Sequence, residues 1–276
     1  TNVSKVYDGS TSMNNVVVGF TGNIPQDDLS ITGNGAFSQK NVGQSLSYTI
    51  SGISLSGADA GNYTLSGGSN SFTGTNGAIT PATLVISSSD ISKVYDRTNT
   101  AAGTAVATQG TQVFGTDALS GGTFAYTDIN VGNGNKVVTV SGVTVSDGNS
   151  GNNYVVSYVD NTTSTINQAP LTIAALTDNK TYDGTTASNL TPSTIGVQVG
   201  DSVTGRTQMF DSAVAGTRTL SVAGYTINDG NSGNNYSVSL QTANGAISVP
   251  AATSQASTQS IQIAVASATS ALSQIA

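Results

Sequence analysis

The chain has 276 residues and a net charge of −7, and only 8% of its residues are charged, against about 25% in an average soluble domain. The acidic balance excludes the basic surface that binding to nucleic acid or to an anionic membrane requires. The sequence contains no His and no Cys, and every acidic residue is Asp, so the usual general bases, thiol nucleophiles and disulfides are missing. We therefore expect no enzymatic activity and no cofactor. No run of 18 apolar residues is present, so we expect no membrane insertion.

Three sequence markers recur in the same order along the chain. The first is a Lys-x-Tyr-Asp motif, and the second is a Gly-Asn-Tyr or Gly-Asn-Asn-Tyr motif. The third is an Ile followed within a few residues by Pro, as in Ala78-Ile79-Thr80-Pro81. Such self-similarity indicates tandem modules, which we place at 1–81, 82–169 and 170–250 and call the first, second and third repeats.

The first repeat differs from the others at its start. The second and third open with the apolar, β-branched segments 82–86 and 171–174, whereas the first begins just before Lys5. We expect that an opening strand is missing and that the chain was cut inside a repeat.

Each repeat reads as short strands separated by turn signals. The segments 45–50, 136–140 and 217–222 alternate polar and apolar residues, which is typical of strands with one buried face. Asn-Gly pairs follow at 34–35, 76–77, 133–134 and 244–245, where we expect hairpin turns. The pattern predicts an all-β protein made of tandem immunoglobulin-like β-sandwich repeats. Because each closing strand passes through Pro into the next opening strand, we expect an elongated, stiff rod.

The tail at 251–276 breaks the repeat pattern. Its apolar residues are spaced by four and three positions from Ile261 to Ile275, which predicts an amphipathic helix. We expect it to dock on the third repeat or to fray as a disordered end, and self-association through the apolar stripe is the alternative. The segment 260–265 also alternates, so a strand is the competing interpretation.

The repeated Lys-Val-Tyr-Asp-Gly and Gly-Asn-Asn-Tyr motifs resemble the YDG-type repeats, relatives of the MBG repeats, of large bacterial exoproteins. Such repeats occur in filamentous-haemagglutinin-like adhesins exported by two-partner secretion. The resemblance covers about 1–250 and implies a sandwich-like module of a secreted or cell-surface adhesin without catalytic residues. Arg97 stands where the other copies have Gly9 and Gly184, so if the glycine has positive φ we expect the second turn to be shaped differently.

The Tyr-Asp motif is the main candidate structural site. Asp can accept a hydrogen bond from the backbone two residues on, and a packed Tyr needs a partner for its hydroxyl, so a turn is favoured over a ligand site. The motif residues are Tyr7, Asp8, Tyr95, Asp96, Tyr182 and Asp183.

Calcium is the candidate ligand. Two Gly-rich loops carry side-chain oxygens of the kind that hard cations bind, although the spacing fits no EF-hand, and a metal-free Asn-Gly turn explains the same residues. The candidate ligands are Asp147, Asn149 and Asn152 in the second repeat and Asp229, Asn231 and Asn234 in the third.

The lysines at the repeated motif, Lys5, Lys93 and Lys180, are candidates for isopeptide crosslinks to Asn. A buried lysine with a lowered pKa could react in this way. Strand-edge lysines that prevent aggregation are the alternative.

The sequence thus favours a structural stalk in an extracellular, cell-surface adhesin. The alternative is direct binding, either to host or cell-surface ligands or to other copies of itself, by strand donation between chains in a filament or biofilm.

Overall fold

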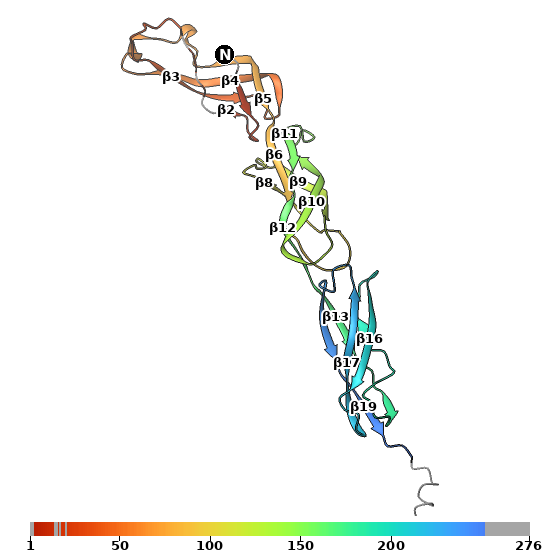
Figure 1. Cartoon of the computed structure of the whole chain (residues 1–276). Helices are drawn as coiled ribbons and strands as arrows, with labels where there is room; N and C mark the ends of the chain where they lie inside the picture. The colour runs from red at the N-terminus through yellow and green to blue at the C-terminus, as the bar shows by residue number, and fades with distance from the viewer. Residues whose placement is uncertain (1–2, 14–15, 17, 20, 252–276) are drawn as a thin grey trace, which may run out of the picture. The chain divides into compact units, whose positions relative to one another are not determined.

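The structure is a computed structural model that describes residues 3–13, 16, 18–19 and 21–251 (Figure 1). Its regular elements are β-strands, together with the single 3₁₀ turns Ala60–Asn62 and Ser66–Gly68. The all-β prediction is therefore confirmed. The tail helix or strand predicted at 251–276 lies, apart from Ala251, outside the described residues. No helix in the described ranges is long and apolar enough to cross a membrane.

The first repeat forms one five-stranded sheet in the order β1-β5-β4-β3-β2. Its strands are β1 (Ser4–Val6), β2 (Ser12–Met13), β3 (Ser30–Phe37), β4 (Gly43–Ser56) and β5 (Phe72–Thr80). The edge strand β1 precedes the Tyr-Asp motif and runs parallel to the closing strand β5.

The second repeat has a corresponding four-stranded sheet, β7-β12-β10-β9, and an additional three-stranded sheet, β11-β6-β8. Its strands are β6 (Ala82–Ser88), β7 (Ser92–Val94), β8 (Ala105–Thr108), β9 (Ala118–Tyr126), β10 (Gly132–Ser146), β11 (Tyr154–Tyr158) and β12 (Asn161–Asn167).

The third repeat follows the same plan, with the sheets β14-β19-β17-β16 and β15-β13-β18. Its strands are β13 (Ala169–Ala174), β14 (Asn179–Thr181), β15 (Ser193–Ile195), β16 (Ser202–Phe210), β17 (Gly216–Asn228), β18 (Tyr236–Gln241) and β19 (Ala243–Ser248).

The opening strands β6 and β13 are the centres of the three-stranded sheets. Each runs parallel to the strand that follows the Asn-Asn-Tyr motif, β11 or β18, and antiparallel to β8 or β15. Leu84 and Ile86 of β6 alternate with polar or partly exposed neighbours and are fully buried. This alternation is what the sequence predicts for a strand with one core-facing side.

In the first repeat no such three-stranded sheet is present among the described residues. The chain after Tyr63, where the other repeats form β11 and β18, continues instead into the 3₁₀ turn Ser66–Gly68. Without a central opening strand, this segment has no ladder to join.

The described chain divides into two compact units. The first comprises 1–93 with 98–166, and the second comprises Val94–Arg97 with 167–276. The Tyr-Asp loop of the second repeat thus belongs to the same unit as the third repeat. In the first unit, a single cluster of buried residues includes Tyr7 and Ile79 from the first repeat and Leu84 and Tyr154 from the second.

The hairpin turns expected at the Asn-Gly pairs are wrong. Three of the pairs lie inside β3, β5 and β19, and the fourth lies at the start of β10. The glycines in the strands are needed for close packing: a Cβ on Gly77 would lie 2.6 Å from the Phe37 ring, and a Cβ on Gly245 would lie 2.2 Å from the Asp178 carbonyl. At Gly77 and Gly245 the glycine therefore accommodates a close neighbour and does not reverse the chain.

Candidate functional site: the tyrosine–aspartate joints

The Tyr of each Lys-x-Tyr-Asp motif, which we call the docking tyrosine, is held by its own repeat in the same way three times. Its backbone N–H donates to the end of the closing strand. Tyr7 bonds to the Thr80 carbonyl at 2.9 Å, Tyr95 to Asn167 at 2.8 Å, and Tyr182 to Ser248 at 2.8 Å.

The lysine of the motif closes the loop that follows the docking tyrosine. The Lys180 ammonium donates to Asp183 Oδ1 at 2.9 Å and to the carbonyls of Thr185 and Ala187 at 2.8 and 2.9 Å. Lys5 makes the corresponding bonds, with Asp8 Oδ1 at 2.6 Å. The hydrogen bonds from Lys180 and from Thr185 lower the pKa of Asp183 to about 2.

Lys93 holds its loop through the carbonyls of Thr98 and Thr100, at 2.7 and 3.2 Å. All three lysines lie on the edge strands β1, β7 and β14. This position is the one expected of strand-edge lysines that prevent aggregation. A charged ammonium that donates to several carbonyls explains their repetition, because such bonds are among the stronger ones in proteins. The isopeptide crosslink stays a prediction.

The side chain of the first repeat's docking tyrosine, Tyr7, packs against residues of the second repeat. The Tyr7 hydroxyl donates to Asp117 Oδ2 at 2.8 Å, and the Tyr154 hydroxyl donates to the same oxygen at 2.8 Å. The Tyr7 and Tyr154 rings meet edge to face, with centroids 5.3 Å apart. Lys40 of the first repeat lies 3.6 Å from the other carboxylate oxygen. We call this arrangement the first joint.

The second joint repeats the arrangement within the second compact unit. Tyr95 donates to Asp201 Oδ2 at 3.0 Å, Tyr236 donates to it at 2.7 Å, and the two rings lie edge to face at 5.6 Å. Asp201 Oδ1 is buried and accepts no hydrogen bond within the described chain, but Arg97 Nε lies 3.3 Å away. The Asp in each joint is thus paired with a cation contributed by the preceding repeat, as a buried carboxylate requires.

The Asp and Tyr that receive the docking tyrosine form what we call the socket. In each socket the Tyr hydroxyl oxygen also accepts a hydrogen bond from a backbone N–H, which belongs to the residue three positions before the Asp. The donor is Phe114 in the first joint, at 2.8 Å, and Gln198 in the second, at 2.9 Å. A turn connects that residue to the Asp and fixes the donor N–H and the carboxylate in place. In each joint the Asp backbone N–H donates to the carbonyl of that residue, with an N–O distance of 3.0 Å.

The first repeat contains the same socket. The Tyr63 hydroxyl donates to Asp27 Oδ2 at 2.6 Å and accepts the Ile24 N–H at 2.9 Å. The Asp27 N–H bonds to the Ile24 carbonyl at 3.1 Å, as in the other two turns.

Burial in both joints raises the pKa of their tyrosines. Burial, followed by the hydrogen bond to Asp201, raises the pKa of Tyr95 to about 12. The same two causes raise the pKa of Tyr7, beside Asp117, well above its ordinary value. Burial and the shared Asp also raise the pKa of Tyr154, against the opposing effect of the Phe114 N–H.

The residue after the Tyr-Asp pair has positive φ in every repeat, at 77° in Gly9, 64° in Arg97 and 79° in Gly184. The expectation of a differently shaped turn at Arg97 is therefore wrong. A left-handed conformation costs a non-glycine residue roughly 1–2 kcal/mol. Arg97 pairs with the fully buried carboxylate of Asp201, and we expect this ion pair to offset the cost.

The predicted calcium loops each organise around one aspartate. Asp147 Oδ1 accepts the N–H groups of Asn149 and Gly151 at 2.7 and 2.8 Å, and Oδ2 accepts that of Asn153 at 3.0 Å. Burial alone raises the pKa of Asp147, but these N–H groups outweigh it and lower the pKa overall. Asn152 donates its side-chain amide to the Asn149 carbonyl at 2.7 Å.

Asp229 has the same three donors, Asn231, Gly233 and Asn235, at 2.8, 2.8 and 3.1 Å. Asn234 donates to the Asn231 carbonyl at 2.8 Å. Within the described ranges, no three His, Cys, Asp or Glu side chains gather as a metal would require. The loops bring the predicted ligands together but direct N–H groups at both carboxylate oxygens, and calcium stays a prediction.

The Asp147 loop also contributes to the first joint through its buried Asn153. The Asn153 side chain accepts the Val42 N–H at 2.9 Å and donates to Asn41 Oδ1 at 3.1 Å. Both contacts reach the first repeat, so the loop supports the joint beside its aromatic centre.

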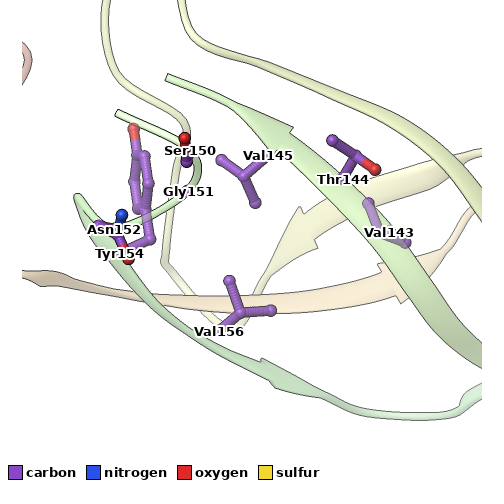
Figure 2. Close-up of a pocket in the computed structure, with 8 residues that line it drawn as sticks. All are labelled: Val143, Thr144, Val145, Ser150, Gly151, Asn152, Tyr154 and Val156. Atoms are coloured by element: carbon purple, nitrogen blue, oxygen red, sulfur yellow. The ribbon is translucent and has the colours of Figure 1, made fainter. Parts of the chain in front are cut away.

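A pocket of about 550 Å³ opens beside this loop, between β10 and β11 (Figure 2). It is lined by Val143, Thr144, Val145, Ser150, Gly151, Asn152, Tyr154 and Val156. Tyr154 contributes the only ionisable group of this lining, and its hydroxyl is already bonded in the joint.

The sequence motifs identified the docking tyrosines but not their partners. Asp117 and Asp201 were missed because neither lies in a repeated motif. A signal was nevertheless present: an Asp precedes the socket tyrosine by 36, 37 and 35 positions in the three repeats.

A family model described as the YDG domain matches residues 1–71, 80–164 and 167–245. No match was found among curated proteins or among solved structures. The matched segments follow the three repeats over most of the length, and each includes a socket tyrosine. The chain therefore belongs to the YDG domain family.

Proposed function

We propose that the chain is a non-catalytic spacer of a bacterial cell-surface or secreted adhesin, in which immunoglobulin-like sandwich modules are coupled in series. The observation that carries this proposal is the joint. In two places, the docking tyrosine of one repeat is 1% exposed and shares a carboxylate with the socket tyrosine of the next repeat.

A flexible string of modules would not need such joints. Burying an aromatic side chain with a satisfied hydroxyl contributes several kcal/mol. The closing strand β5 passes through a single residue, Pro81, into the opening strand β6, so the covalent connection at the first joint is also short and restricted. Together these features support transmission of force or distance along the chain.

Small-angle scattering of the whole chain tests the mechanical part of this proposal. We expect an elongated particle whose maximum dimension is well defined, and a broader distribution when Tyr7 and Tyr95 are both replaced by Ala. Tyr225→Ala, at an exposed tyrosine of β17, is the matched control. A compact particle, or unchanged scattering in the double variant, would contradict a stalk built on these joints.

The cellular part needs a separate test. Antibodies against the chain should label intact, non-permeabilised cells of the source bacterium or precipitate the parent protein from its culture medium. Detection only after lysis would overturn the adhesin assignment while leaving the joints unaffected.

A further inference from the structure

Tyr182 has the setting of a docking tyrosine but is not docked on any part of the chain that the structure describes. Its N–H is bonded to the closing strand β19, and Lys180 and Asp183 close its loop. Tyr7 and Tyr95, held in the same way, are each 1% exposed, whereas Tyr182 is 48% exposed.

The neighbouring glycine gives the same contrast. A Cβ placed on Gly9 would lie 3.0 Å from the Cβ of Phe114, because the loop presses against the socket of the second repeat. Among the described residues, a Cβ on Gly184 would meet no atom within 4 Å. The side of this loop that is covered in the first joint is therefore open in the third repeat.

The opposite half of a joint is open in the first repeat. Tyr63, Asp27 and the Ile24 N–H reproduce the hydrogen bonds of the occupied sockets. Tyr63 remains partly exposed, while its counterparts Tyr154 and Tyr236 are 6% and 3% exposed. Ile24, at the position of Phe114, is 60% exposed.

We propose that these two halves are complementary, so that Tyr182 of one copy docks into the Asp27–Tyr63 socket of a second copy. The inference rests on the proposed function, since it extends the internal joint to a contact between chains. The docked phenol would donate to Asp27 Oδ2, as Tyr7 donates to Asp117. Such a contact is head to tail, because it joins different surfaces of the two copies.

Large apolar side chains near this loop are exposed to solvent, and a protein partner would bury them. Val249 follows β19 directly, as Pro81 follows β5, and it is 73% exposed. Burial of Val249 and Tyr182 would remove apolar area from water. The two halves of a joint inside one chain are held at a high effective concentration, which favours their association. Contacts between copies lack this advantage, so we expect them to be weaker and to need covalent trapping for detection.

The absence of Cys from the sequence makes disulfide trapping clean. Gly184→Cys and Ile24→Cys correspond in position to Gly9 and Phe114, whose Cβ positions lie near the range that a disulfide bridges. Arg97 shows that a side chain is accepted at this left-handed position. The two single-Cys chains are mixed under mild oxidation, and mixed dimers are separated by non-reducing electrophoresis with one chain tagged.

We expect a mixed dimer from Gly184→Cys with Ile24→Cys, and a ladder of oligomers from the chain that carries both. The matched control replaces Gly184→Cys by Ile195→Cys, a 72% exposed position on β15. Adding Tyr182→Ala to the first chain, or Asp27→Ala to the second, should reduce the mixed dimer to the level of that control.

A mixed dimer no more abundant than with Ile195→Cys, or one unaffected by Tyr182→Ala, would overturn the contact between copies. The double variant Gly9→Cys, Phe114→Cys separates this outcome from failure of the proposed function. Its internal disulfide should form whether or not copies associate, and its absence would contradict the joint itself.

Discussion

Tyr7 donates a 2.8 Å hydrogen bond to Asp117, which lies 110 positions further along the chain and in the next repeat. The same bond recurs between Tyr95 and Asp201, 106 positions apart. A motif that reads as a local turn therefore has its main side-chain contact in another module. Several consequences of this relationship can be measured.

Removing the hydroxyl of Tyr7 should weaken the first joint while leaving its packing in place. We expect Tyr7→Phe to lower the free energy of unfolding of the first compact unit by about 1.5–3 kcal/mol, as for hydrogen bonds to charged groups. Urea unfolding followed by circular dichroism measures the change. Tyr225→Phe is the control and should be within about 0.5 kcal/mol of the parent chain, since that side chain is exposed. Equal effects of the two changes would rule out the joint as a source of stability.

Arg97 combines a strained backbone with a buried ion pair. We expect Arg97→Ala to be destabilising, because it keeps the left-handed backbone and leaves Asp201 without its cation. Arg97→Gly loses the same pair but relieves the strain, so it should be more stable than Arg97→Ala by about 1 kcal/mol. Thermal unfolding of the two variants and the parent tests this order, and a parent less stable than Arg97→Gly would show that the ion pair does not offset the strain.

The joints should open in alkali. The pKa of Tyr95 rises from 10.0 to about 12 on folding, so the folded chain holds this proton more tightly than the unfolded chain. The stabilisation is fully present below pH 10 and is lost as the pH rises through about 12. Tyrosinate absorbance and circular dichroism, recorded along one alkaline titration, should change together. Full ionisation of every tyrosine near pH 10 with the fold intact would contradict buried joint tyrosines.

The Asp147 carboxylate should be needed for its loop. Asp147→Asn keeps the shape but turns an amide group toward backbone N–H donors, so we expect a loss of about 1–3 kcal/mol for the unsatisfied groups. The comparison is Asp160→Asn, a nearby change outside the loop. Hydrogen exchange at Asn149, Gly151 and Asn153 should accelerate in the loop variant alone, and unchanged protection would show that the carboxylate is dispensable.

Calcium and chelator give a direct test of the metal hypothesis. Because N–H groups occupy both oxygens of Asp147 and of Asp229, we expect the thermal midpoint to be the same with excess calcium and with excess chelator. A ligand present at 100 times its Kd would stabilise the folded state by about 2.7 kcal/mol. A rise of that size would establish calcium binding and overturn the metal-free interpretation of the loops.

The limits of prediction from sequence are clearest at individual residues. The apolar, β-branched segments 82–86 and 171–174 were correctly predicted as opening strands, because such residues favour strands locally. The Asn-Gly pairs led to a wrong prediction of hairpin turns. The same dipeptide occurs in turns and in strands whose glycine leaves room for a neighbouring ring, such as that of Phe37. Only the neighbouring strand distinguishes these cases.

The sequence by itself determined the all-β class, the three repeats and the identity of the docking tyrosines, because composition, period and repetition are properties of the linear chain. Tertiary structure decided what those tyrosines do. Asp117 and Asp201 become their partners only when the closing strand of one repeat leads into the opening strand of the next and brings distant residues within hydrogen-bond distance. Burial then makes this hydrogen bond important for stability, because a phenol and a carboxylate that are removed from water lose their bonds to it and must bond to each other.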